Sequence, residues 1–294
     1  MFLSLSSLAL ACPISPQQLD QQLTKAKSLK LNVDLMGEEN LTEADFNSVV
    51  ARIKDHFTPI FLAKGKTLNV NSSWTVPLNN ALATEDFRGS NVFFFGLFTK
   101  NKYMTKDAFL FVGCHEIGHH LGGFPKNTGS MAWATIEGQS DYFAAAKCYR
   151  EILKNDPENA NAETLILPES VKEKCKAQYA DEEGYRICLR SARTAEDVGK
   201  ILDYISTSTE RPETFLLEPV PAAVVKTVSS HPKAICRTHT IMEASLCHVA
   251  SDIDISETDE TVGICHPKNG DTLGNRPLCW FKPKEEPPVV TTSK

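Results

Sequence analysis

The chain has 294 residues, of which 41% are hydrophobic and 23% charged, and its formal net charge is -6 at pH 7. These proportions are ordinary for a globular protein, and the negative charge offers no basic surface for nucleic acid, which we do not expect as a partner. The length predicts one main domain with an appended segment, and beyond the N-terminus no apolar run approaches the roughly 20 residues of a membrane span. Nothing in the composition indicates an oligomeric state.

The N-terminus has features of an export signal. Residues 1–12 read MFLSLSSLALAC, and Ala9-Leu10-Ala11 has the small-x-small form of a signal-peptidase site. Cys12 stands where the acylated cysteine of a bacterial lipoprotein would stand. We therefore expect an exported protein of the periplasm, cell envelope or extracellular space. A lipid anchor at Cys12 and a frayed apolar N-terminus without any signal are the two alternatives to simple secretion.

Hydrophobic periodicity and turn residues divide the rest of the chain. In chain order we expect helices within 16–64, strands at 66–74 and 90–98, a helix that begins after Thr105 and runs through residues 115–119, and further helices at about 134–153, 169–180, 184–192, 194–206 and 218–228. After the signal-like residues 1–12, these elements form an N-terminal helical segment at 16–64, a core at 65–250, a cysteine-rich extension at 251–282 and a disordered tail at 283–294.

Cysteine usage indicates an oxidising compartment. Apart from Cys12, the cysteines are Cys114, Cys148, Cys175, Cys188, Cys236, Cys247, Cys265 and Cys279, an even number without a CxxC pair. The last four are closely spaced, which favours a disulfide-stapled extension. Their proximity suggests the pairs Cys236–Cys247 and Cys265–Cys279. We expect Cys114, at the end of the apolar run FLFVGC, to remain unpaired; buried free thiols throughout are the alternative.

Two histidines on one predicted helix form the central motif of the chain. His115 and His119 are four residues apart, so both imidazoles project from one face of the helix and can reach one ion at about 2.0–2.1 Å. Glu116 lies about 100° further around the helix axis, so it can contact a water beside the ion without binding the ion itself. This is the HExxH pattern of zinc metallopeptidases; a chance pattern on a solvated helix is the alternative.

A third protein ligand must come from outside this motif. In one class of zinc peptidases the ligand is the last histidine of HExxHxxGxxH, but here that position is Pro125, which cannot bind zinc. Glu137 and Asp141 are four residues apart on the next predicted helix. Glu137 can complete a His2Glu site for Zn2+, and Asp141 can accept a hydrogen bond from a ligand histidine. A solvated acidic pair is the alternative, although such a pair is self-repelling and the apolar residues YFAAA follow at once.

These motifs resemble those of the gluzincin zinc peptidases. They are most similar to the family of the CAAX prenyl endopeptidase, the bacterial heat-shock membrane protease and their small soluble relatives. The resemblance rests on Asn80-Ala81 before the strand at 90–98, on His115-Glu116-Ile117-Gly118-His119, on Glu137-x-x-x-Asp141, and on His231-Pro232 with Arg237. It covers about residues 66–240 and does not extend to the cysteine-rich end. The sequence shows no counterpart of the membrane spans of the larger relatives.

The resemblance implies an α+β fold with a gluzincin-like core, in which a small sheet packs on the active-site helix and the glutamate helix. It implies one Zn2+ per chain at the site described above. By the same resemblance His231 is an oxyanion or product-side donor and Asn80 a contact to the substrate backbone. Arg237 is either a buried structural partner or a contact to a substrate carboxylate. A helix-start role for His231 and a turn role for Asn80 are the alternatives.

Together these features predict an exported zinc endopeptidase. A metal-activated water would hydrolyse the peptide bond, with Glu116 as the general base that takes its proton and passes it to the leaving amine. The peptide or protein substrate would lie as an extended strand along the edge of the strand at 90–98. A core strand is the alternative for this segment, because its three consecutive phenylalanines suggest burial on both faces. Two other functions remain open: a non-catalytic, zinc-stabilised binding protein of the cell envelope, and a hydrolase of a non-protein amide such as a cell-wall peptide.

Overall fold

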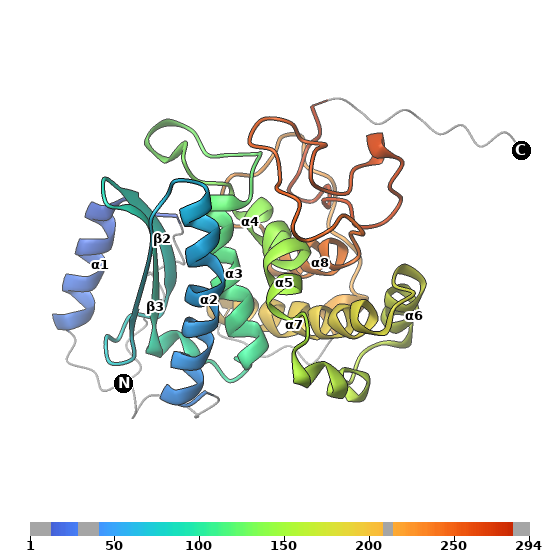
Figure 1. The fold of residues 1–294 in the computed structure, drawn as a ribbon, viewed down its shortest axis with the longest axis horizontal. Helices are drawn as coiled ribbons and strands as arrows, with labels where there is room; N and C mark the ends of the chain where they lie inside the picture. The colour runs from blue at the N-terminus through green and yellow to red at the C-terminus, as the bar shows by residue number, and fades with distance from the viewer. Residues whose placement is uncertain (1–12, 29–40, 208–213, 285–294) are drawn as a thin grey trace, which may run out of the picture.

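The computed structural model describes residues 13–28, 41–207 and 214–284. It is an α+β structure in which helices predominate and a three-stranded sheet lies toward one side (Figure 1). The predicted α+β class with a small sheet is therefore confirmed. The predicted signal at 1–12, with Cys12, and most of the predicted tail at 283–294 lie outside the described residues.

The sheet consists of β1 (Leu68–Ser73), β2 (Ala81–Asp86) and β3 (Gly89–Phe95). Its order is β1-β3-β2, with β1 parallel and β2 antiparallel to β3. The strand predicted at 90–98 is thus the central strand, and neighbouring strands pair with both its edges, so the prediction that a substrate adds to this strand is wrong. The sequence does not predict β2, because Thr84 is the one residue of ALATED among the β-branched and aromatic types that are typical of strands.

The helices, in chain order, are α1 (Pro16–Ser28), α2 (Glu43–Ala63), α3 (Lys106–Leu121), α4 (Glu137–Phe143), α5 (Arg150–Ile152), α6 (Glu169–Gln178), α7 (Glu182–Thr207) and α8 (Ala234–Ser245). A π-helical turn at Ala144–Tyr149 joins α4 to α5, so the helix predicted at 134–153 exists as one continuous element. The helices predicted at 184–192 and 194–206 are instead a single helix, α7.

The prediction of a helix at 218–228 is wrong. Pro219 and Pro221 cannot donate the backbone hydrogen bonds that a helix needs. The segment is extended and pairs with the end of the chain, where Val224 N donates to Leu278 O at 2.9 Å and Val228 N donates to the carbonyl of Trp280 at 2.8 Å. This pairing ties the segment that precedes His231 to the C-terminal extension.

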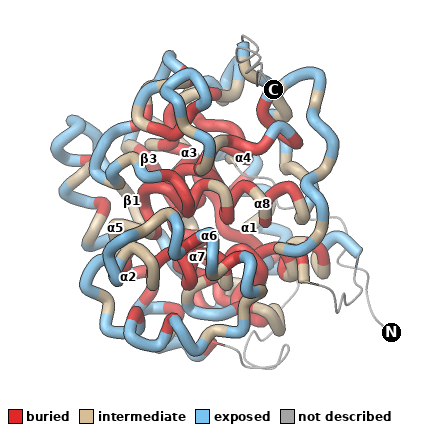
Figure 2. Tube along the Cα trace, turned by 90° about the vertical axis from the view of Figure 1, so that its right-hand side faces the viewer, coloured by how far each residue is buried: buried red, intermediate tan, exposed pale blue. Residues whose placement is uncertain are grey.

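The sheet lies between two helical layers (Figure 1). On one face, Ile14 and Leu19 of the N-terminal segment pack against Leu82 and Phe95. On the other face, Val92 and its neighbours join the main apolar cluster, to which α2 and α3 contribute. Alternation of side chains along β2 and β3 divides their residues between these two clusters. The most deeply buried segments gather around β3, α3 and α4 (Figure 2).

The helices α3 and α4 pack very closely. At Gly118 a Cβ atom would lie 2.5 Å from the hydroxyl oxygen of Ser140, so a side chain at this position would push α4 away. The Ser140 hydroxyl also donates to the carbonyl of His115. One helical turn further, Cys114 of α3 forms a disulfide with Cys148 of the π-helical turn. The prediction that Cys114 is unpaired is therefore wrong, because the cysteine faces a partner on the neighbouring helix.

The C-terminal extension is held to the core by disulfides, but not by the predicted ones. The structure pairs Cys236 with Cys279 and Cys247 with Cys265, whereas closeness in sequence suggests the opposite arrangement. The observed pairs join Cys236 of α8, and Cys247 just after the end of α8, to later segments that fold back over this helix. A further disulfide, Cys175–Cys188, links α6 to α7. Four disulfides among the described residues are consistent with the expected export of the protein.

Replacing both Cys236 and Cys279 with serine is expected to lower the free energy of unfolding by about 3–4 kcal/mol. The reason is that this cross-link joins residues 43 positions apart and so restricts the unfolded chain strongly. Removing Cys175–Cys188, which spans only 13 positions, should cost less. Urea unfolding followed by circular dichroism measures both losses. A larger loss for the shorter loop would contradict this expectation.

Among the described residues, every helix is too short or too polar to cross a lipid bilayer.

Candidate metal centre

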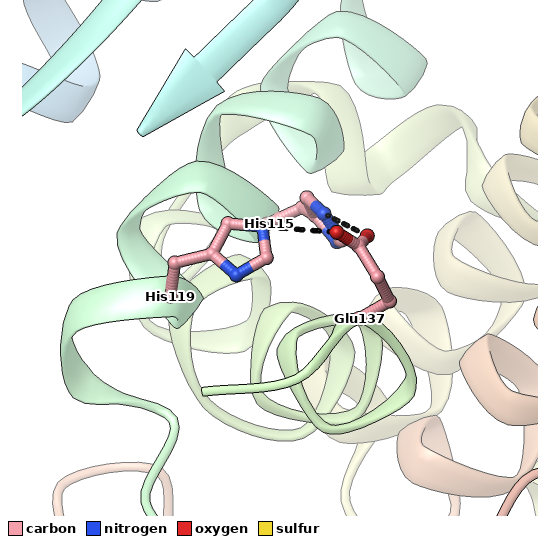
Figure 3. Close-up of side chains that lie close together, drawn as sticks. All are labelled: His115, His119 and Glu137. Carbon is pink, nitrogen blue, oxygen red and sulfur yellow. Dashed lines mark ion pairs between the residues drawn. The ribbon is translucent and has the colours of Figure 1, made fainter. Parts of the chain in front are cut away.

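Three buried side chains converge in the interior of the protein. His115 and His119 of α3 and Glu137 of α4 offer donor atoms that all lie within 4.8 Å of one another (Figure 3). The Nε2 atom of His115 is 3.2 Å from Oε2 of Glu137, and the Nε2 atom of His119 is 3.8 Å from Oε1 of the same carboxylate. These residues could hold a metal ion.

Local structure places the two helices that carry these donors. The Thr105 hydroxyl accepts from Ala108 N and starts α3, and helical periodicity then brings both histidines to one side. After α3 the chain turns back, and Thr135 N donates to His119 O at 2.9 Å. Glu137, the first residue of α4, is thereby held opposite the histidine pair.

Both histidines are oriented by a hydrogen bond at Nδ1. The Nδ1 atom of His115 lies 2.8 Å from Oδ1 of Asp141, and that of His119 lies 2.8 Å from the carbonyl oxygen of Thr135. A carbonyl oxygen can only accept, so His119 must carry its proton on Nδ1. In both rings Nε2 faces Glu137, and in His119 it is left to bind a metal. Burial works to lower the pKa of His115, but the negative charge of Asp141 outweighs it and raises this pKa to about 10, so a metal would bind Nε2 of His115 in place of a proton. The prediction assigns such an orienting role to Asp141, and the sequence gives no signal for Thr135.

Asp141 is itself held by Arg237 of α8. The guanidinium binds it in a bidentate manner, with Nε 2.7 Å from Oδ2 and Nη2 2.8 Å from Oδ1. Burial works to raise the pKa of Asp141, but the positive charges of Arg237 and His115 outweigh it and hold this pKa well below its usual range. The carboxylate is therefore ionised when it orients His115. Burial lowers the pKa of His119 to about 3, so this imidazole is neutral, as a metal ligand must be.

The unsatisfied atoms fit a metal ion. The Nε2 atom of His119 and both carboxylate oxygens of Glu137 are buried and make no hydrogen bond with acceptable geometry to any described residue. Buried polar atoms normally have partners. Zinc at about 2.0–2.1 Å from each of two ligands in tetrahedral geometry separates those ligands by about 3.3–3.4 Å, which is close to the 3.2 Å between His115 and Glu137. The donor set therefore fits a tetrahedral cation with one position left for another ligand.

One side of this group opens onto a small cavity. The cavity has a volume of about 30 Å³, and Glu116 and His231 line it together with His115. Glu116 is deeply buried, with 2% of its surface exposed, whereas the side chain of His231 is 31% exposed and its Nε2 atom lies 3.1 Å from Oε2 of Glu137. The rest of the lining is mainly apolar: Ala81, Phe98, Phe111, Val112, Val198, Ile201 and Leu202, with Arg237.

The structure brings most of the predicted site residues together. The predicted pair of Glu137 and Asp141 points inward as expected. Arg237 lies beside the centre and uses two of its nitrogen atoms for Asp141, so a contact to a substrate carboxylate stays a prediction. Asn80 is buried immediately before β2, where its side-chain oxygen accepts from Ala81 N at 3.0 Å. Its contact to a substrate backbone also stays a prediction.

No protein-family model, no curated protein and no solved structure matches this chain. The case for a function therefore rests on the geometry of the centre.

Adding zinc to the metal-free protein is expected to raise its midpoint of thermal unfolding. Zinc at 100 times its dissociation constant would stabilise the folded state by about 2.7 kcal/mol. His119→Ala removes one donor and should abolish most of this shift. His56→Ala, at a partly exposed histidine of α2 that belongs to neither candidate metal group of the described residues, is the matched control. Calorimetry with zinc and with a chelator measures the effect, and an undiminished shift in His119→Ala would contradict the assigned ligands.

Proposed function

We propose that this protein is a zinc-dependent endopeptidase of the gluzincin type. The observation that carries the proposal is the buried group of His115, His119 and Glu137, whose free donor atoms leave one side open toward Glu116. A structural zinc site has four protein ligands, whereas a catalytic one typically has three and keeps an open position. An acidic side chain at that open position is the feature that distinguishes a hydrolytic site.

When bound, zinc would lower the pKa of a water at the open position and polarise the carbonyl of the scissile bond. Glu116 would take a proton from that water and later transfer it to the leaving amine. Its burial supports this role, because an acid–base group acts best where bulk water is excluded. Asp141 and Arg237 would hold His115 in its orientation throughout the reaction.

The cavity beside Glu116 indicates what kind of substrate residue would lie there. Its walls include Phe98, Val112, Ile201 and Leu202, contributed by the segment after β3 and by α3 and α7. An apolar wall favours an apolar side chain next to the scissile bond. The cavity is small as observed, so binding of a large side chain would require the surrounding residues to move. We therefore propose peptides with a small or medium apolar residue beside the cleaved bond.

The edge of β2 is where an extended substrate would best fit. β2 is an edge strand, and Ala81 at its start lines the cavity with His115 and Glu116. A peptide added along this edge would pass the proposed reaction site. Part of the edge is already used, because Ile14 N donates to Ala83 O at 3.2 Å. The substrate would therefore pair with β2 at the end that includes Ala81.

The proposal is tested by metal analysis combined with cleavage of a degenerate peptide library. The zinc-loaded protein is expected to cleave peptides with an apolar residue on one side of the bond, to lose activity with a chelator, and to regain it when zinc is added back. Mass spectrometry of the products gives the preferred sequence. Absence of any cleavage by protein that contains one zinc per chain would reject the proposal.

A second candidate function, a non-catalytic zinc-stabilised binding protein, is favoured by one contact. The Nε2 atom of His231 lies 3.1 Å from Oε2 of Glu137, so a small movement would allow it to become a fourth protein ligand and close the site. His231 does not, however, belong to the group of donors within 4.8 Å of one another. X-ray absorption spectroscopy of the zinc protein distinguishes the two functions: three histidine ligands would support the binding protein, and two would support the peptidase.

A further inference from the structure

We propose that the C-terminal extension contains a second binding site, for a small ligand that has one carboxylate group and an apolar body. The site is a cavity of about 460 Å³ that shares no lining residue with the metal centre. Its lining consists of His266, Pro267, Asn275, Arg276, Leu278, Phe281, Lys282 and Pro283. A volume of this size is typical of small-molecule sites.

A buried positive charge lies at this cavity. Arg276 is only 5% exposed, and its guanidinium donates to the backbone carbonyls of Phe124 and Glu260 and to the amide oxygen of Gln139. All three acceptors are uncharged. Within the described part of the chain, no carboxylate forms an ion pair with Arg276, and its Nε atom has no hydrogen-bond partner. Burial lowers the pKa of Arg276 to about 10, so the group is still charged at neutral pH.

A buried cation without a counter-ion is costly, and an anion in the adjoining cavity would offset that cost. Two acidic groups lie close by. The charge of Glu260 raises the pKa of Arg276 without forming an ion pair with it, so it offsets the buried charge only in part, and both carboxylates accept hydrogen bonds from other groups. The carboxylate of Glu260 accepts from the backbone nitrogen of Lys284 at 3.2 Å, and that of Asp271 accepts from His266 N at 2.8 Å. None of the lining residues is acidic, and Lys282 adds a second positive charge. The electrostatic potential of the cavity therefore favours an anion.

Other polar atoms at the cavity also lack partners. His266 is 3% exposed, and its Nε2 atom makes no hydrogen bond to a described residue. Burial lowers the pKa of His266, so the imidazole is neutral and can donate one hydrogen bond from this nitrogen. The side-chain oxygen of Asn275 is likewise unsatisfied. Unsatisfied polar groups next to a cavity of this size indicate a ligand or ordered water in place of an empty apolar void.

The remaining walls specify the rest of the ligand. Pro267, Leu278, Phe281 and Pro283 are apolar, and the Arg276 guanidinium stacks 3.7 Å from the centroid of the Phe281 ring. One carboxylate balances the buried guanidinium of Arg276, whereas a phosphate dianion would bring a second negative charge that only the exposed Lys282 could balance. An apolar monocarboxylate fits this combination. The same chemistry is present in a free carboxylic acid and in the C-terminus of a peptide.

Isothermal titration calorimetry of the full chain tests the proposal, with 4-phenylbutyrate as the probe for a free acid and N-acetylphenylalanine as the probe for a peptide C-terminus. At least one of them is expected to bind with one site per chain, and its uncharged amide at least tenfold more weakly. Whichever of the two binds more tightly identifies the source of the carboxylate. Each titration is done on zinc-loaded and on metal-free protein, because a carboxylate can also bind zinc. Binding that persists in the metal-free protein assigns the ligand to this cavity, whether or not the metal centre proves to be catalytic.

Variants locate the binding. Arg276→Gln is expected to weaken binding of the acid at least tenfold, and Leu278→Trp, at a half-exposed lining residue, should block it by filling the cavity without altering the buried contacts. Arg88→Gln, in the exposed turn between β2 and β3, is the control. If Arg276→Gln does not fold, Leu278→Trp decides. Absence of saturable binding, equal affinity for acid and amide, binding only in the presence of zinc, or unchanged binding in Leu278→Trp would overturn the proposal.

Discussion

Replacing Glu116 with glutamine is expected to lower kcat/KM for peptide cleavage by about 10²–10⁴-fold, which is the usual contribution of a general base. Glutamine has nearly the same shape but cannot accept the proton. Because Glu116 is not among the grouped donor atoms, this variant should still bind one zinc per chain. Cleavage of a fluorogenic peptide measures the loss, and elemental analysis measures the retained metal.

A matched variant at an exposed acidic residue separates this effect from a general change in charge. Glu257→Gln alters a carboxylate that pairs with Lys126 away from the centre, and it should leave cleavage unchanged. Full activity in a Glu116→Gln preparation that is free of contaminating peptidase would refute the proposed mechanism. Loss of zinc together with activity would show that Glu116 supports the metal site and does not act as the base.

Replacing Arg237 with methionine is expected to lower the free energy of unfolding by about 3–5 kcal/mol. The substitution leaves the carboxylate of Asp141, which has 0% exposure, without its bidentate partner in the protein interior. The loss is measured by urea unfolding of the metal-free protein, so that weaker metal binding does not contribute. Arg186→Met, which removes a partly exposed partner of Glu163, should have a much smaller effect.

A double variant identifies the cause of this loss. Replacing Asp141 with asparagine in the Arg237→Met background removes the unpaired charge, so it should recover part of the lost stability. If the double variant were less stable than Arg237→Met by the full cost of a second independent substitution, the two side chains would not be coupled. The same variants report on the centre, because a disoriented His115 should weaken zinc binding by about 10–100-fold.

The sequence alone determined the local parts of the centre. Because residues four apart on a helix share a face, the spacing of His115 and His119, and that of Glu137 and Asp141, predicts which side chains point together. The structure bears out the helix that carries each pair and the inward direction of the acidic pair. Strands β1 and β3 were predictable for a similar reason, since alternating or continuous apolar residues are a local signal.

Only the tertiary structure decided how these parts meet. The convergence of Glu137 on the histidines, the carbonyl of Thr135 behind His119 and the bidentate contact of Arg237 with Asp141 join segments far apart in the chain. The same holds for the disulfide partners and for the pairing of β3 on both edges, which corrected the predicted substrate edge. Such contacts depend on how helices and strands pack against each other, and the periodicity of a single segment does not encode them.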